Sequence, residues 1–163
     1  MGNIDISALE KEVRAYANKV ASNTARIIAD ELTEEASSSI SDFYDDYEPR
    51  YYRRHYYNLQ KNGFQRYYRN PHNTIFYGGV ELTPERMDDL YNASPEQVLN
   101  TVMGGFHGVA SMITAGYADM GFINQTSFVP RMIPTPMERL LDKKEYITRN
   151  IQKYIDRAQR TVK

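Results

Sequence analysis

The stretch Ser7-Ala8-Leu9-Glu10 begins the part of the sequence that decides the fold, residues 7–36. It forms a capping box, in which the Ser7 hydroxyl accepts from the third helical amide and Glu10 reaches back to the cap amide. Apolar residues then recur at spacings of three and four, with no Pro or Gly before Pro49. The pattern predicts one long amphipathic helix over residues 7–36. Its apolar stripe consists of Leu9, Val13, Tyr16 or Ala17, Val20, Thr24, Ile27 or Ile28 and Leu32.

A helix over residues 7–36 is long for the size of the chain. It would span about 45 Å at 1.5 Å per residue, whereas the 163 residues suit a single small domain. We therefore expect one domain, 1–163, with part of this helix packed on another chain.

The second half of the chain predicts short strands and helices. Thr74–Leu82 is typical of a strand, and Gly78-Gly79 within it indicates a bulge or turn. Hydroxyl residues followed by Pro predict short helices over 84–91 and 95–103. Gly104-Gly105 ends the second of them, and residues 104–134, which contain five glycines, are expected to form short strands or an extended loop.

The chain closes on a predicted helix over residues 135–162. Thr135, Pro136 and Glu138 form a capping box with Pro at the first helical position. Its outer face carries basic residues, whereas its apolar stripe faces inward. The expected fold class is α+β, with a long N-terminal helix and a C-terminal helix packed on a small, mostly antiparallel sheet. The stripe consists of Met137, Leu140 or Leu141, Ile147, Ile151, Tyr154 or Ile155, Ala158 and Val162.

Composition argues against several functional classes. The sequence has no Cys, so thiolate metal sites and cysteine nucleophiles are excluded. His55, His72 and His107 lie too far apart in sequence to suggest a metal site. No phosphate-loop or nucleophile-elbow pattern occurs. We therefore expect no enzyme activity, no cofactor and no metal, in a soluble protein without a membrane segment.

The most distinctive stretch is the Tyr/Arg segment, residues 43–72. It contains most of the chain's 14 Tyr, and no acidic residue occurs between Pro49 and Arg69. Tyr and Arg are enriched at protein interfaces, but rings and guanidinium groups also bind single-stranded nucleic acid, and some of the Tyr could fill the core. Upstream carboxylates and a net charge of −1 favour a protein interface. The candidate interface residues are Tyr47, Arg50, Tyr51, Tyr52, Arg53, Arg54, Tyr56, Tyr57, Arg66, Tyr67 and Tyr68.

The order of these elements resembles the small tail-completion or head-tail joining proteins of long-tailed bacteriophages. The chain departs from the commonest pattern of that family, because a Val-Asp-Thr-Gly segment after the first helix is absent and the Tyr/Arg segment stands in its place. The residues that carry the resemblance are Tyr44, Tyr47, Pro49, Tyr52, Arg53 and Leu59, then Gly104-Gly105-Phe106-His107-Gly108, then Pro134-Thr135-Pro136.

The resemblance implies a structural protein of the virion neck, made in the cytoplasm of a bacterial host. Its partners would be further copies of itself in a six- or twelve-fold ring, the adaptor or stopper protein, and the tail-tube or terminator protein. Transient contact with genomic DNA in the channel is also implied. The alternative is a nucleic-acid-binding accessory protein that uses the Tyr/Arg segment.

Overall fold

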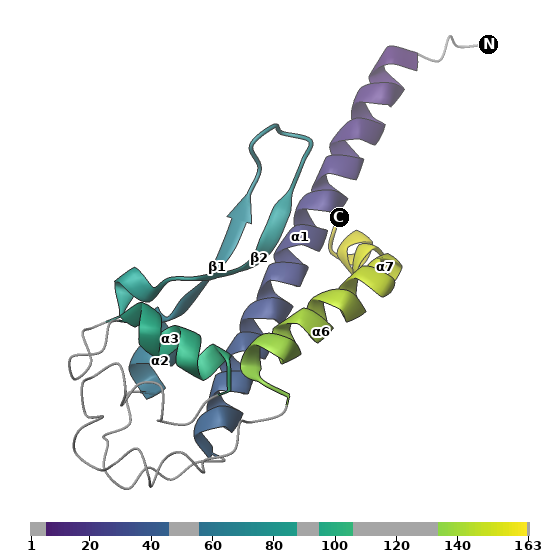
Figure 1. The fold of residues 1–163 in the computed structure, drawn as a ribbon. Coiled ribbons are helices and arrows are strands. Elements are labelled where there is room, and N and C mark those ends of the chain that lie inside the picture. The colour runs from purple at the N-terminus through teal and green to yellow at the C-terminus, as the bar shows by residue number, and fades with distance from the viewer. Residues whose placement is uncertain (1–5, 46–55, 88–94, 106–133, 163) are drawn as a thin grey trace, which may run out of the picture.

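The computed structural model describes residues 6–45, 56–87, 95–105 and 134–162, and Figure 1 shows their arrangement around one long helix. The fold is α+β, as the sequence predicted. The elements are α1 (Ile6–Asp45), α2 (Tyr56–Asn62), β1 (Phe64–Arg69), β2 (Tyr77–Leu82), the 3-10 helix η1 (Pro84–Arg86), α3 (Pro95–Met103), α6 (Pro136–Arg149) and α7 (Ile151–Thr161).

Helix α1 is longer than the sequence predicted. It has 40 residues and spans about 60 Å at 1.5 Å per residue. Its C-terminal turns continue past the serine triplet at 37–39 because they are part of the core: Ile40, Phe43 and Tyr44 are all buried. The Ser39 hydroxyl donates to the Ala36 carbonyl, which satisfies this buried group within the helix. Tertiary packing therefore overrides the weak helix propensity of the serines.

The hairpin of β1 and β2 is a two-stranded antiparallel sheet. Strand β1 lies inside the Tyr/Arg segment, where the sequence predicted no regular element. Strand β2 begins at Tyr77, three residues later than expected. The expected bulge or turn at Gly78-Gly79 is wrong, because Gly79 pairs with Tyr67 and Gly78 with Tyr68 in an unbroken ladder.

Gly78 is required by a close approach between the hairpin and α1. A Cβ atom at Gly78 would lie 1.9 Å from the Ala25 carbonyl oxygen and 2.6 Å from its carbonyl carbon. Backbone packs directly on backbone at this point, and the small Ala25 and Ala29 are both buried on α1 nearby. The glycine pair thus serves close packing of strand on helix rather than a change of chain direction.

The C-terminal region forms two helices instead of one. The capping box at Thr135 is confirmed: its hydroxyl accepts from the Glu138 amide, and the Glu138 carboxylate accepts from the Thr135 amide. The expected continuous helix breaks at Asn150, whose side-chain amide donates to the Tyr146 carbonyl. The Asn150 backbone amide also donates to the Tyr146 and Ile147 carbonyls, and Asn150 itself leaves helical geometry at φ −115° and ψ 22°. Because Asn150 caps the last turn of α6 in this way, the chain turns between α6 and α7. Both helices pack against α1, on the side away from the hairpin (Figure 1).

A buried apolar cluster lies at the C-terminal end of α1. It joins α1 to α2, the start of β1, α3 and α6. Leu59, Leu99 and Ile40 are among the most completely buried side chains. The cluster fixes the lower half of α1, as drawn in Figure 1, and leaves its N-terminal turns outside the core.

Replacing Gly78 tests the close approach of β2 to α1. We expect Gly78→Ala to lower the free energy of unfolding by about 3 kcal/mol, since a Cβ there meets backbone that cannot move aside. Gly79→Ala is the matched control, because its Cβ would meet the flexible Tyr67 ring, at 2.8 Å. Urea denaturation measures both variants. Equal losses in the two would contradict this account of the packing.

Candidate interface

The structure describes five of the eleven candidate interface residues. Tyr56 and Tyr57 begin α2, whereas Arg66, Tyr67 and Tyr68 lie on β1. The other six fall outside the described residues: Tyr47, Arg50, Tyr51, Tyr52, Arg53 and Arg54. The interface role of the whole set stays a prediction. The structure does show the contacts of the three candidates on β1.

Tyr68 joins the hairpin to α1. Its hydroxyl lies 2.9 Å from the Ser22 hydroxyl, and the Arg26 guanidinium sits 4.9 Å above its ring. Phe76 also stacks on Tyr68, with 6.4 Å between ring centroids. These contacts match the internal-packing alternative for this residue.

Arg66 lies on the same face of β1 and also reaches α1. Its Nε lies 2.6 Å from an Asp30 carboxylate oxygen, and its guanidinium donates to the Arg26 carbonyl over 3.4 Å. Both side chains of the ion pair remain largely exposed, so the pair adds little to stability. The pair nevertheless holds the Arg66 guanidinium against α1.

Tyr67 points to the opposite face of the hairpin because side chains alternate along a strand. Its ring covers Gly79, and the Arg69 guanidinium lies 5.3 Å from the ring centroid. Arg69 also pairs with Glu81 at 3.1 Å. This outward face carries the aromatic and basic groups of β1 that do not contact α1.

The α1 arm, defined as residues 6–19, exposes a continuous apolar stripe. Ile6 is 75% exposed, Leu9 52%, Val13 59% and Tyr16 47%. Their spacing of three and four places them on one side of the helix. Val20 and Thr24 continue this spacing but are buried. The stripe is therefore buried at Val20 and exposed from Tyr16 to Ile6. The first turns of α1 extend past the hairpin and α7 (Figure 1).

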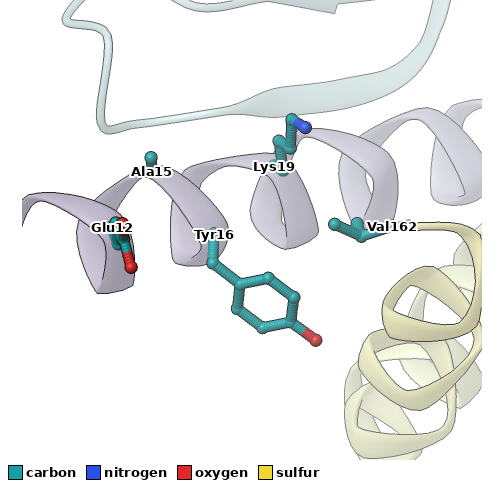
Figure 2. A pocket seen from close by; sticks show the side chains of 5 residues that line it. All are labelled: Glu12, Ala15, Tyr16, Lys19 and Val162. Atoms are coloured by element: carbon teal, nitrogen blue, oxygen red, sulfur yellow. The ribbon is translucent and has the colours of Figure 1, made fainter. Parts of the chain in front are cut away.

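An open groove marks the place where the covered part of the stripe ends. It has a volume of about 260 Å³ and is lined by Glu12, Ala15, Tyr16, Lys19 and Val162. Figure 2 shows the Tyr16 ring projecting from α1 beside Val162, which follows the last turn of α7. The groove is shallow and continuous with the α1 arm, so it belongs to the same exposed surface.

A hydrogen-bonded cluster around Glu31 holds α6 and α7 against α1. Tyr154 donates its hydroxyl to the Glu31 carboxylate at 2.7 Å, Arg157 donates at 2.9 Å, and Lys143 lies 3.2 Å away. Partial burial raises the pKa of Glu31, but the hydrogen bonds and positive charges outweigh it and bring the pKa below its ordinary value. Burial, with the Glu31 carboxylate, raises the pKa of Tyr154 to about 12.

A second cluster fixes the start of α6. Arg139 pairs with Glu35 at 2.9 Å and also with Asp42, and it donates to the Ser38 hydroxyl over 3.4 Å. Together the two clusters determine the position of α6 and α7 relative to the α1 arm. The sequence could not predict this, since the partners lie about 100 or more residues apart.

The described residues contain no group of three or more His, Asp or Glu side chains placed to hold a metal ion. Within the same ranges, no helix is both long and apolar enough to cross a membrane.

Comparison with known proteins shows the family of the chain. A family model described as YomN matches residues 5–157, nearly the whole sequence, so the chain belongs to the YomN family. No curated protein matches it, and no solved structure matches it.

The Glu31 cluster makes stability depend on acid pH. The pKa of Glu31 is lowered on folding, so its stabilisation is complete above the ordinary value of 4.5 and is lost as pH falls through the lower folded value. We expect Glu31→Gln to lose about 1 to 2 kcal/mol of stability at neutral pH. Its free energy of unfolding should also fall less steeply than that of the wild type as the pH is lowered. Glu34→Gln, at an exposed neighbour, is the control. Chemical denaturation across acid pH measures this, and an equally steep fall in all three proteins would contradict the role of Glu31.

Proposed function

We propose that this member of the YomN family is a structural protein of the bacteriophage neck, a ring subunit between the head connector and the tail tube. The chain would have no enzymatic role and would reside in the virion. Its partners would be copies of itself, an adaptor or stopper protein, and a tail-tube or terminator protein. The order of elements behind the phage resemblance supports this proposal. It consists of a long first helix, the Tyr/Arg segment, a short strand and a Thr-Pro-capped closing region.

The observation that carries the proposal is the bare apolar stripe of the α1 arm. Water-exposed apolar groups in a contiguous row are unfavourable in a free monomer and usually mark a site of protein contact. The arm is about 20 Å long at 1.5 Å per residue, and its first turns extend beyond the described elements that pack on α1 (Figure 1). A subunit built in this way is suited to assembly with neighbours.

The spacing of the stripe favours a helix as the covering partner. Ile6, Leu9, Val13, Tyr16 and Val20 alternate spacings of three and four, which is the narrow seam of helix-on-helix packing. Further along α1 the same side is covered by α6 and α7 of the same chain. The arm thus continues the surface of α1 that binds helices beyond the point where α6 and α7 end.

The nucleic-acid alternative draws less support from the described residues. Arg66 and Tyr68, which would supply a phosphate contact and a stacking ring, are both engaged with α1. A net charge of −1 provides no general attraction to phosphate. On the outward face, Arg69 pairs with Glu81 and lies 5.3 Å from the centroid of the Tyr67 ring, so these two side chains contact each other and the hairpin.

Removing the apolar character of the α1 arm tests the proposed function. We expect Leu9→Ser with Val13→Ser to fold normally, since both side chains are exposed, and to abolish tailed particles. Ile75→Ser is the control, because Ile75 is an exposed apolar residue on the hairpin. Complementation of a phage lacking this gene, with electron microscopy and mass spectrometry of the particles, gives the result.

Normal tailed particles with wild-type occupancy of the arm variant would refute an assembly role for the arm. A triple variant, Tyr51→Ala, Tyr52→Ala and Arg53→Ala, tests the Tyr/Arg segment in the same assay. Loss of particles is expected there too.

DNA binding is expected to be weak and salt-sensitive. Phosphate contacts by a few Arg side chains lose most of their affinity at physiological salt. Fluorescence anisotropy with single- and double-stranded oligonucleotides at about 150 mM salt measures it. Stable submicromolar binding would favour the nucleic-acid-binding accessory protein over the neck subunit.

A further inference from the structure

The C-terminal helices carry two sets of Tyr and basic side chains, and only one set holds a carboxylate. The inner set, Tyr154, Arg157 and Lys143, binds Glu31 of α1. The second set is Tyr146, Lys153 and Arg160. Tyr146 is half exposed, and the Lys153 ammonium lies 5.8 Å from its ring centroid.

Lys153 and Arg160 lie on one side of α7, two helical turns apart. Both are exposed, and neither has an ion pair among the described residues. The surface formed by Tyr146, Lys153 and Arg160 therefore offers the kinds of side chain that bind Glu31 on the inner side. We call it the α7 outer surface. The neighbouring carboxylate of Asp156 accepts a hydrogen bond from Gln152 and forms no ion pair with either cation.

The α1 arm supplies carboxylates on both flanks of its apolar stripe. Glu12 lies one turn from Leu9 and Tyr16, on one flank, and Glu10 lies one turn from Ile6 and Val13, on the other. Glu10 pairs with Arg14 at 2.8 Å, on the side of the helix away from the stripe. Glu12 has no ion pair among the described residues.

These flanks disfavour pairing of two arms with each other. In an antiparallel pair centred on the four exposed apolar residues, Glu12 would face Glu12 of the second copy, and Glu10 would face Glu10. Like charges at such positions destabilise helix pairs. A partner with basic flanks and an exposed aromatic side chain fits the stripe better, and the α7 outer surface has both.

We infer that the α1 arm of one copy docks on the α7 outer surface of a second copy, with Glu12 facing Lys153 and Arg160 and the apolar stripe against Tyr146. This rests on the proposed function, because it names the neighbour that a ring subunit would bind. The two surfaces are different parts of the chain, so the contact is head-to-tail. Such contacts propagate from copy to copy and close into a ring where the rotation permits.

The absence of Cys from the sequence allows a direct test by cross-linking. Leu9→Cys places one thiol on the arm. Asp156→Cys places one on α7 within a turn of both Lys153 and Arg160. We expect a short bismaleimide to give abundant dimer when the two variants are mixed at high concentration, and at least about tenfold less with either variant alone, as a head-to-tail contact requires.

Two results of this experiment would overturn the inference. Leu9→Cys alone giving as much dimer as the mixture would mean that arms pair with each other. No dimer in any sample would mean that the arm does not bind the α7 outer surface.

Charge reversal tests the pairing of Glu12 with the basic residues. In the cross-linking mixture, Glu12→Lys on the arm variant is expected to lower the dimer yield about fivefold, and adding Lys153→Glu to the other variant should restore it. Lys11→Glu, on the opposite side of the arm, is the control and should leave the yield unchanged. Failure of the second reversal to restore the yield would contradict the assigned pair.

Particle assays separate this inference from the proposed function. If the cross-link forms but the protein is absent from tailed particles, the neck assignment fails and the contact stands. If the protein is present in particles while Glu12→Lys incorporates normally and no cross-link forms, the neck assignment stands and the assigned contact fails.

Discussion

The whole structure depends on α1 offering two opposite faces to different partners. On one face, backbone at Gly78 approaches Ala25 so closely that no side chain fits between them, and this contact sets the hairpin against the helix. On the other face, Glu31 and Glu35 hold α7 and α6 through Tyr154, Arg157 and Arg139. Both faces are occupied along the middle of α1. Toward the N-terminus the helix continues while its described partners end, and this produces the exposed stripe of the α1 arm.

Local signals in the sequence predicted several elements correctly. The periodic apolar residues predicted α1. Thr135 and Glu138 predicted the start of α6, and both hydrogen bonds of their capping box are present in the structure. Ser94-Pro95 gave α3, which ends at Met103 directly before Gly104-Gly105. These features depend on residues within one or two helical turns of each other, so a single sequence is enough to predict them.

Features set by distant contacts could not be predicted in the same way. Strand β1 was not predicted, because its Tyr-rich and Arg-rich sequence has no clear strand periodicity. The strand forms through pairing with β2 and packing on α1, and both contacts are nonlocal. Gly78-Gly79 suggested a bulge, whereas the real requirement is the Ala25 backbone, which lies 53 residues earlier in the sequence. For the candidate interface, the length of the first helix predicted that part of it packs on another chain, but the spacing of Leu9, Val13 and Tyr16 did not show which turns of the helix lie exposed. Composition alone did not reveal the hydrogen bond between the Tyr68 and Ser22 hydroxyls.

We propose that the α1 arm is an assembly surface of a phage neck subunit. The decisive measurement is cryo-electron microscopy of tailed particles from a phage that encodes this chain. We expect density for the chain at the head-tail junction, in several symmetry-related copies, with Leu9, Val13 and Tyr16 buried against an adjacent copy. Particles that lack this chain at the junction would contradict the account. So would a ring in which the stripe of the α1 arm faces solvent.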